Sequence, residues 1–167
     1  SKPVAEAKLE RPPGKVISVV GARGGVGATT IALNLAGIVA DRAPGKKVVL
    51  VDVDPHGGSV ALSLDLDPSR GMREALEKPE RLDSLFMDRV VSKPLKNLSV
   101  LSSEEALHEH IVVNEKALEI LLKELRDAFD VIILDVMLPE INGFQVAKTI
   151  RAADAKTAII MLTARAA

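Results

Sequence analysis

The sequence predicts a single α/β domain of three layers, in which a five-stranded parallel sheet lies between two layers of helices. The chain has 167 residues, which is the length of one domain. Short apolar runs alternate along it with segments of helical periodicity, the pattern of a parallel sheet covered on both faces. A glycine-rich stretch follows the first apolar run, at the position where a strand leads into a helix.

The expected strands and helices alternate after an irregular leader over residues 1–14. Five apolar runs are the expected strands: 16–20, 48–51, 98–101, 131–134 and 158–162. Three segments have apolar residues at helical spacing: 29–40, 114–127 and 143–153. The stretch 56–96 is polar and broken by prolines and a glycine, so short helices and loops are expected there.

The composition excludes several classes of protein. The chain has no cysteine, which excludes disulfides, thiolate zinc sites and cysteine nucleophiles. The chain has 22 lysine and arginine residues and 23 acidic residues. It has no surplus of basic residues that would indicate a nucleic-acid partner, so none is expected. Aromatic residues make up 2% of the chain, too few for a platform that stacks the bases of a single strand. No apolar run approaches the ~20 residues of a membrane helix, so we expect a cytoplasmic protein without a membrane partner.

The glycine-rich stretch has the features of a phosphate-binding loop. Glycines let the backbone wrap closely around an anion, and the helix that follows adds its positive end. The general pattern G-x-x-x-x-G-K-[ST] is altered twice, because Ala22 replaces the first glycine and Ala28 replaces the lysine. The predicted phosphate-binding residues are Arg23, Gly24, Gly25, Val26, Gly27, Ala28, Thr29 and Thr30.

Two of the expected strands end in acidic residues. Asp52 and Asp54 alternate after the second strand, so both side chains point to one face, and Asp135 ends the fourth strand. Ligands of open α/β sheets collect at the carboxyl edge of the strands, where these three carboxylates are expected. A pair of carboxylates that only caps a turn is the alternative interpretation of Asp52 and Asp54.

Together these motifs resemble the deviant Walker motif of the ParA/MinD ATPases, and within that group the CpaE/TadZ-type pilus-assembly proteins. The resemblance rests on residues 23–30, on the acidic stretch 48–58 and on the strand 129–135, which is similar to the Walker B strand of the family. It implies a P-loop NTPase fold, flavodoxin-like in its layers. Numbered along the chain, the five strands would lie in the order 3-2-4-1-5.

The resemblance also implies roles for individual residues. Arg23 stands where the family carries an extra lysine that contacts phosphates across an ATP-bound dimer, so a monomer or a homodimer is expected. Magnesium would be held by Thr29, Asp52 and Asp135, and Asp52 or Asp54 would position the attacking water. The implied ligand is ATP or ADP with magnesium.

Ala28 predicts weak or absent hydrolysis, because the lysine that it replaces normally neutralises charge that develops in the transition state. Backbone N–H groups alone would still hold the phosphates. A scaffold that retains only residual anion binding is the alternative function.

After Asp135 the sequence resembles a second family. Residues 135–144 are similar to the segment that follows the phospho-accepting aspartate of CheY-like receiver domains of response regulators. Residues 159–165 resemble the receiver strand whose threonine, here Thr163, hydrogen-bonds the phosphoryl group. In this interpretation Asp135 is a phospho-acceptor. The two resemblances predict an engineered or recombined chimera, in which an ATPase-like portion (15–135) is joined near residues 130–136 to a receiver-like completion (136–167).

Overall fold

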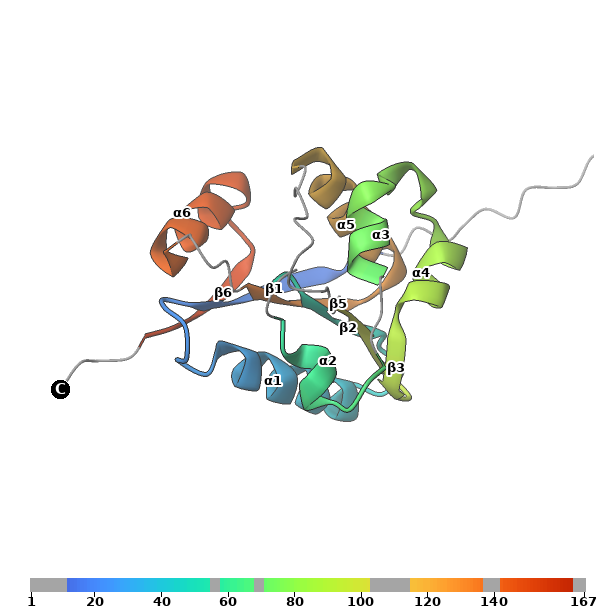
Figure 1. Cartoon of the computed structure of the whole chain (residues 1–167), viewed down its shortest axis with the longest axis horizontal. Coiled ribbons are helices and arrows are strands. Elements are labelled where there is room, and N and C mark those ends of the chain that lie inside the picture. The colour runs from blue at the N-terminus through green and yellow to red at the C-terminus, as the bar shows by residue number, and fades with distance from the viewer. Residues whose placement is uncertain (1–11, 55–57, 68–70, 103–114, 137–141, 164–167) are drawn as a thin grey trace, which may run out of the picture.

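The computed structural model describes residues 12–54, 58–67, 71–102, 115–136 and 142–163. Within these ranges, helices cover both faces of one sheet, as Figure 1 shows. The three layers that the alternation of apolar runs and helical segments predicts are therefore present.

The sheet contains six strands. They are β1 (Lys15–Gly21), β2 (Val48–Asp52), β3 (Ser92–Leu95), β4 (Leu98–Leu101), β5 (Val131–Val136) and β6 (Ala158–Leu162). Their order is β3-β4-β2-β5-β1-β6, and every pair is parallel except β3 with β4. The order expected for the five apolar strands is confirmed, because those strands are β1, β2, β4, β5 and β6.

The expectation of five strands is wrong, because the sheet has six. The additional strand is the antiparallel edge strand β3. This strand has only four residues and contains Pro94, which has no N–H to donate. Proline is tolerated at the edge of a sheet, where one side of the strand needs no partner. The four residues of β3, Ser-Lys-Pro-Leu, contain no apolar run that would indicate a strand.

The helices divide between the two faces of the sheet. Their bounds are α1 (Ala28–Arg42), α2 (Val60–Ser63), α3 (Gly71–Glu77), α4 (Ser84–Val90), α5 (Glu115–Ala128) and α6 (Gly143–Ala153), with a 3₁₀ turn at Pro79–Arg81. In Figure 1, α1 and α2 lie below the sheet, and α3, α5 and α6 lie above it. Each face has its own core of buried hydrophobic side chains.

Helix α1 packs closely against the sheet. Every fourth residue on its inner side is a buried alanine: Ala28, Ala32, Ala36 and Ala40. These small side chains let the helix axis approach β1, β2 and β5, with which α1 is in contact. The amino end of α1 is thereby held at the carboxyl edge of the central strands.

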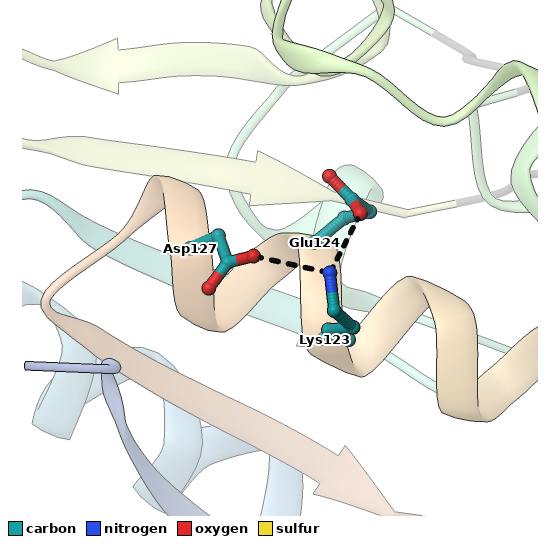
Figure 2. A network of polar contacts seen from close by, with 3 residues as sticks. All are labelled: Lys123, Glu124 and Asp127. Atoms are coloured by element: carbon teal, nitrogen blue, oxygen red, sulfur yellow. Dashed lines mark hydrogen bonds and ion pairs between the residues drawn. The ribbon is translucent and has the colours of Figure 1, made fainter. Parts of the chain in front are cut away.

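Helix α5 separates an apolar face from a charged face. Leu121 and Leu125 are fully buried in the core above the sheet. On the outer side, the Lys123 ammonium lies 3.3 Å from a carboxylate oxygen of Asp127 and 3.4 Å from one of Glu124 (Figure 2). These contacts raise the pKa of Lys123, with the hydrogen bond to Asp127 as the main cause. The cluster is exposed to solvent, so it contributes little to stability.

The last helix and strand complete the sheet beside β1. Gly21 is opposite Leu162 in the ladder, and the Ala22 N–H donates to the Leu162 carbonyl at 2.8 Å. Helix α6 begins directly against the end of β1. A Cβ on Gly143 would collide with the Gly21 carbonyl and lie 3.0 Å from the Ala22 Cα. Only a glycine permits that approach, which fixes α6 next to the start of the glycine-rich loop.

Ser18, in the middle of β1, is buried without a hydrogen-bond partner for its hydroxyl among the described residues. An unpartnered buried hydroxyl destabilises a fold because it has lost its bonds to water. We expect Ser18→Ala to raise the free energy of unfolding by about 1 kcal/mol, measured by urea denaturation. A loss of stability would show that the hydroxyl has a partner in the folded protein.

Candidate functional site

The loop between β1 and α1 owes its shape to two glycines. Gly25 and Gly27 have φ of 74° and 87°, in the left-handed region where a side chain is strained. Gly27 precedes the first turn of α1, and its carbonyl accepts a hydrogen bond from the Ile31 N–H at 3.0 Å. A loop of this conformation, opening into a helix, directs backbone N–H groups toward a bound anion.

A cavity of about 350 Å³ lies between this loop and the carboxyl ends of β2 and β5. Eight of the residues predicted from the sequence line it: Gly25, Gly27, Ala28, Thr29, Thr30, Asp52, Asp54 and Asp135. Two further lining residues, Gly58 and Ser59, were not predicted. They follow the acidic motif closely in sequence, but no residue type there indicates a ligand contact.

Three predicted loop residues do not line the cavity. Arg23 and Gly24 are exposed, and Val26 is half-buried. The structure therefore does not bring the Arg23 side chain to the cavity of its own chain. Contact of Arg23 with phosphates across a dimer stays a prediction.

Thr29 and Asp135 both line the cavity and contact each other. The Thr29 hydroxyl donates a hydrogen bond to the Asp135 carboxylate. Asp135 is only 2% exposed, and its Oδ1 has no hydrogen-bond partner among the described residues. Burial raises the pKa of Asp135, with the Asp54 charge as a smaller cause, while the Thr29 bond lowers it. One buried carboxylate oxygen beside the cavity thus lacks a partner.

Asp52 is the neighbour of Asp135 in the sheet, on the adjacent strand β2. Its Oδ1 accepts from the Asp54 N–H and its Oδ2 from the Val60 N–H, each at 3.2 Å. Asp52 is 2% exposed, and burial raises its pKa from 3.8 to about 6. Both carboxylate oxygens therefore bind backbone, as expected if Asp52 caps a turn.

The residues present fit a magnesium ion that is bound together with a phosphate. The partnerless Oδ1 of Asp135 and the Thr29 hydroxyl are oxygen ligands of the type that magnesium prefers. In the described part of the chain, no three histidine or acidic residues form a group that could hold a metal ion. Magnesium takes few protein ligands and completes its shell with water and substrate phosphate, so this sparse set is sufficient.

The structure does not bring together the two residues of the receiver-like interpretation. Strand β6, which leads to Thr163, pairs with β1, whereas a receiver would place it beside the strand of Asp135. Asp135, the phospho-acceptor of this interpretation, is also buried, one residue before the end of β5. The intervening residues 137–141, which carry part of the receiver-like motif, lie outside the described residues.

The comparison with protein families decides between the two resemblances. A family model described as an AAA domain matches residues 14–166. The chain belongs to this ParA/MinD-type family of P-loop ATPases. The chain is 33% identical over 130 residues to the septum site-determining protein MinD of Helicobacter pylori, and it covers 47% of that relative. It is also 33% identical to the chromosome-partitioning ATPase Soj of Treponema pallidum, of which it covers 48%.

These alignments include 78% of the chain for MinD and 73% for Soj. The chain thus spans about half the length of the curated relatives that it matches. In the part of the chain that the structure describes, no helix combines the length and apolar character needed to cross a bilayer.

Solved structures confirm the fold. A ParA family ATPase from Chlorobium tepidum superimposes with a TM-score of 0.67 at 18% identity, over 88% of this chain and 73% of that one. Cobyrinic acid a,c-diamide synthase from Mycobacterium smegmatis, with bound ADP and magnesium, gives a TM-score of 0.58 at 22% identity. That match covers 89% of this chain and 72% of the synthase.

The family match continues through the expected join at residues 130–136 and ends at residue 166. None of the matches described above indicates a receiver-like portion after residue 135. One family model spans both portions of the expected chimera, and the division of the chain at residue 135 stays a prediction.

The raised pKa of Asp52 predicts a pH-dependent stability. The folded state binds the Asp52 proton more tightly than the unfolded state, so this contribution is complete below about pH 4 and is lost as pH rises through about 6. At pH 7.5 we expect Asp52→Asn to raise the free energy of unfolding by about 2 kcal/mol, after subtracting one lost backbone hydrogen bond. At pH 4 we expect the difference to disappear.

Urea denaturation between pH 4 and 8 measures this effect, with the exposed Asp41→Asn on α1 as the control. The pKa of Asp135 is also raised, so this residue makes the free energy of unfolding fall with rising pH in the same way. The Asp52→Asn protein therefore keeps part of the pH dependence of its stability. Identical pH profiles for the wild-type and Asp52→Asn proteins would contradict the prediction.

Proposed function

We propose that the chain binds the phosphates of ATP or ADP, together with magnesium, at residues 23–30, and that it hydrolyses ATP weakly or not at all. The proposal rests on one observation, which is that four groups line the same cavity. They are the left-handed glycines, the start of α1, the Thr29 hydroxyl and the Asp135 carboxylate. Membership of a P-loop ATPase family supports the same assignment.

In this proposal, different residues of the cavity bind different parts of the ligand. Backbone N–H groups at Gly25, Gly27 and the first turn of α1 donate to phosphate oxygens. Thr29 and Asp135 hold the metal side of the ligand, and the Asp54 carboxylate orients water at the mouth. The chemistry that bound magnesium supplies is neutralisation of phosphate charge.

Weak hydrolysis follows from Ala28. Ala28 is 3% exposed and belongs to the core below the sheet, although it also lines the cavity. A methyl group donates no hydrogen bond and carries no charge, so the γ-phosphate lacks the cation that P-loop ATPases place there. Binding then depends on N–H donors and on the dipole of α1.

The phosphates, and not the base, are expected to supply most of the affinity. Phe86 and Phe129 are buried in the core, and no aromatic residue lines the cavity among the described residues. Arg23 faces solvent at the loop, which suits contact with a nucleotide held by a second copy. We therefore propose nucleotide as the ligand of a monomer or homodimer.

Calorimetric titration with ATP and with ADP, in the presence of magnesium, tests nucleotide binding. We expect Gly27→Glu to abolish the heat of binding, because the variant places a carboxylate and a strained φ in the loop. Gly37→Glu is the matched control, since it adds the same charge to α1 where no atom lies within 4 Å of a Cβ. The absence of heat for the wild-type protein would leave the anion-binding scaffold as the function.

Ala28→Lys tests the reason given for weak hydrolysis. A lysine here reaches the cavity that Ala28 lines, so we expect magnesium-dependent phosphate release to rise by at least ~10-fold. Ala28→Met, of similar length without charge, is the control and should give no increase. An equal increase for both variants, or unchanged release by a lysine variant that still binds ATP, would contradict this account.

A further inference from the structure

Gly58 lies directly against the carboxylate of Asp52. A Cβ built on Gly58 would lie 2.7 Å from the Asp52 Cγ and 2.8 Å from its Oδ1, and it would also collide with Oδ2. Distances below 3.0 Å do not occur for real Cβ atoms, so the carboxylate occupies the place where a side chain would stand. Asp52 is buried, and two hydrogen bonds from backbone N–H groups hold its carboxylate in place.

Space, and not backbone conformation, is the reason for glycine at this position. The glycines with positive φ in the described part of the chain are Gly25, Gly27 and Gly45, and Gly58 is not among them. An alanine at position 58 could adopt the same backbone angles. It could not coexist with the Asp52 carboxylate in its present position.

The Asp52 carboxylate holds both ends of the segment between β2 and α2. It accepts hydrogen bonds from the Asp54 N–H on one side and from the Val60 N–H on the other. Asp54 and Ser59, which lie next to these two contacts, line the cavity. Displacing the carboxylate would therefore release the wall of the cavity that faces the glycine-rich loop.

We infer that Gly58 is a positioning residue, whose missing side chain lets Asp52 fix Asp54 and Ser59 at the rim of the cavity. The effect on ligand binding rests on the proposed function, whereas the effect on the segment itself does not. By this inference, Asp52 acts through the backbone that it holds, and the oxygen directed to the ligand belongs to Asp135.

Amide hydrogen exchange tests the positioning without nucleotide. We expect Gly58→Ala to reduce the protection of the Val60 amide by about tenfold or more, because its acceptor is displaced. Gly37→Ala adds the same methyl group on α1, where a Cβ meets nothing within 4 Å, and should leave Val60 unchanged. Unchanged protection in Gly58→Ala would overturn the inference.

A double-mutant cycle tests whether the effect passes through Asp52. In an Asp52→Ala background the clash is gone, so Gly58→Ala should change Val60 exchange by less than twofold. If Gly58→Ala alone fails to fold, the double variant should fold as well as Asp52→Ala. An equal effect of Gly58→Ala in both backgrounds, or an unfolded double variant beside a folded Asp52→Ala protein, would overturn the inference.

Nucleotide titration then tests the consequence for the ligand. We expect Gly58→Ala to weaken ATP binding with magnesium about tenfold, because Asp54 and Ser59 lose their positions at the cavity. Equal binding by Gly58→Ala and wild type with magnesium would overturn the role at the cavity. A wild-type protein that binds no nucleotide would refute the proposed function, while the exchange measurements would still decide whether Gly58 positions Asp52.

Discussion

The parallel pairing of β1 with β5 is the contact on which the rest of the site depends. The ladder runs from Lys15 opposite Val131 to Val20 opposite Val136, so both strands reach the same edge of the sheet. The glycine-rich loop leaves β1 at this edge, and Asp135 stands there on β5. A shift of this register by one residue would turn Asp135 to the other face and separate it from Thr29.

The three carboxylates of the site differ because their surroundings differ. Asp52 uses both oxygens on backbone N–H groups, whereas Asp135 keeps one oxygen without a partner in the described structure. Asp54 is half-buried and lines the same cavity. Burial without a nearby cation is costly for a carboxylate, which is why the pKa values of Asp52 and Asp135 are raised. A ligand that brings a divalent cation would remove that cost.

Local patterns in the sequence were sufficient to predict the central strands, the loop and most of the cavity. β1, β2 and β5 are continuous apolar runs, and Gly25 and Gly27 stand where a tight loop must form. Edge strand β3 was not predicted, because Pro94 interrupts its short sequence. The contact of Gly58 with Asp52 was not predicted for a different reason: it is a tertiary distance between two residues, and no pattern of residue types indicates it.

The two edges of the sheet differ in how they meet solvent and other chains. Edge strand β3 carries Lys93 and Pro94, a charge and a missing donor that both discourage addition of a foreign strand. The other outer strand, β6, reads Ala-Ile-Ile-Met-Leu and has Ile160 37% exposed. An apolar edge of this kind is a template for unwanted strand pairing. Among the described strands, β6 is therefore the edge that is better suited to pair with a further strand, and β3 is the protected one.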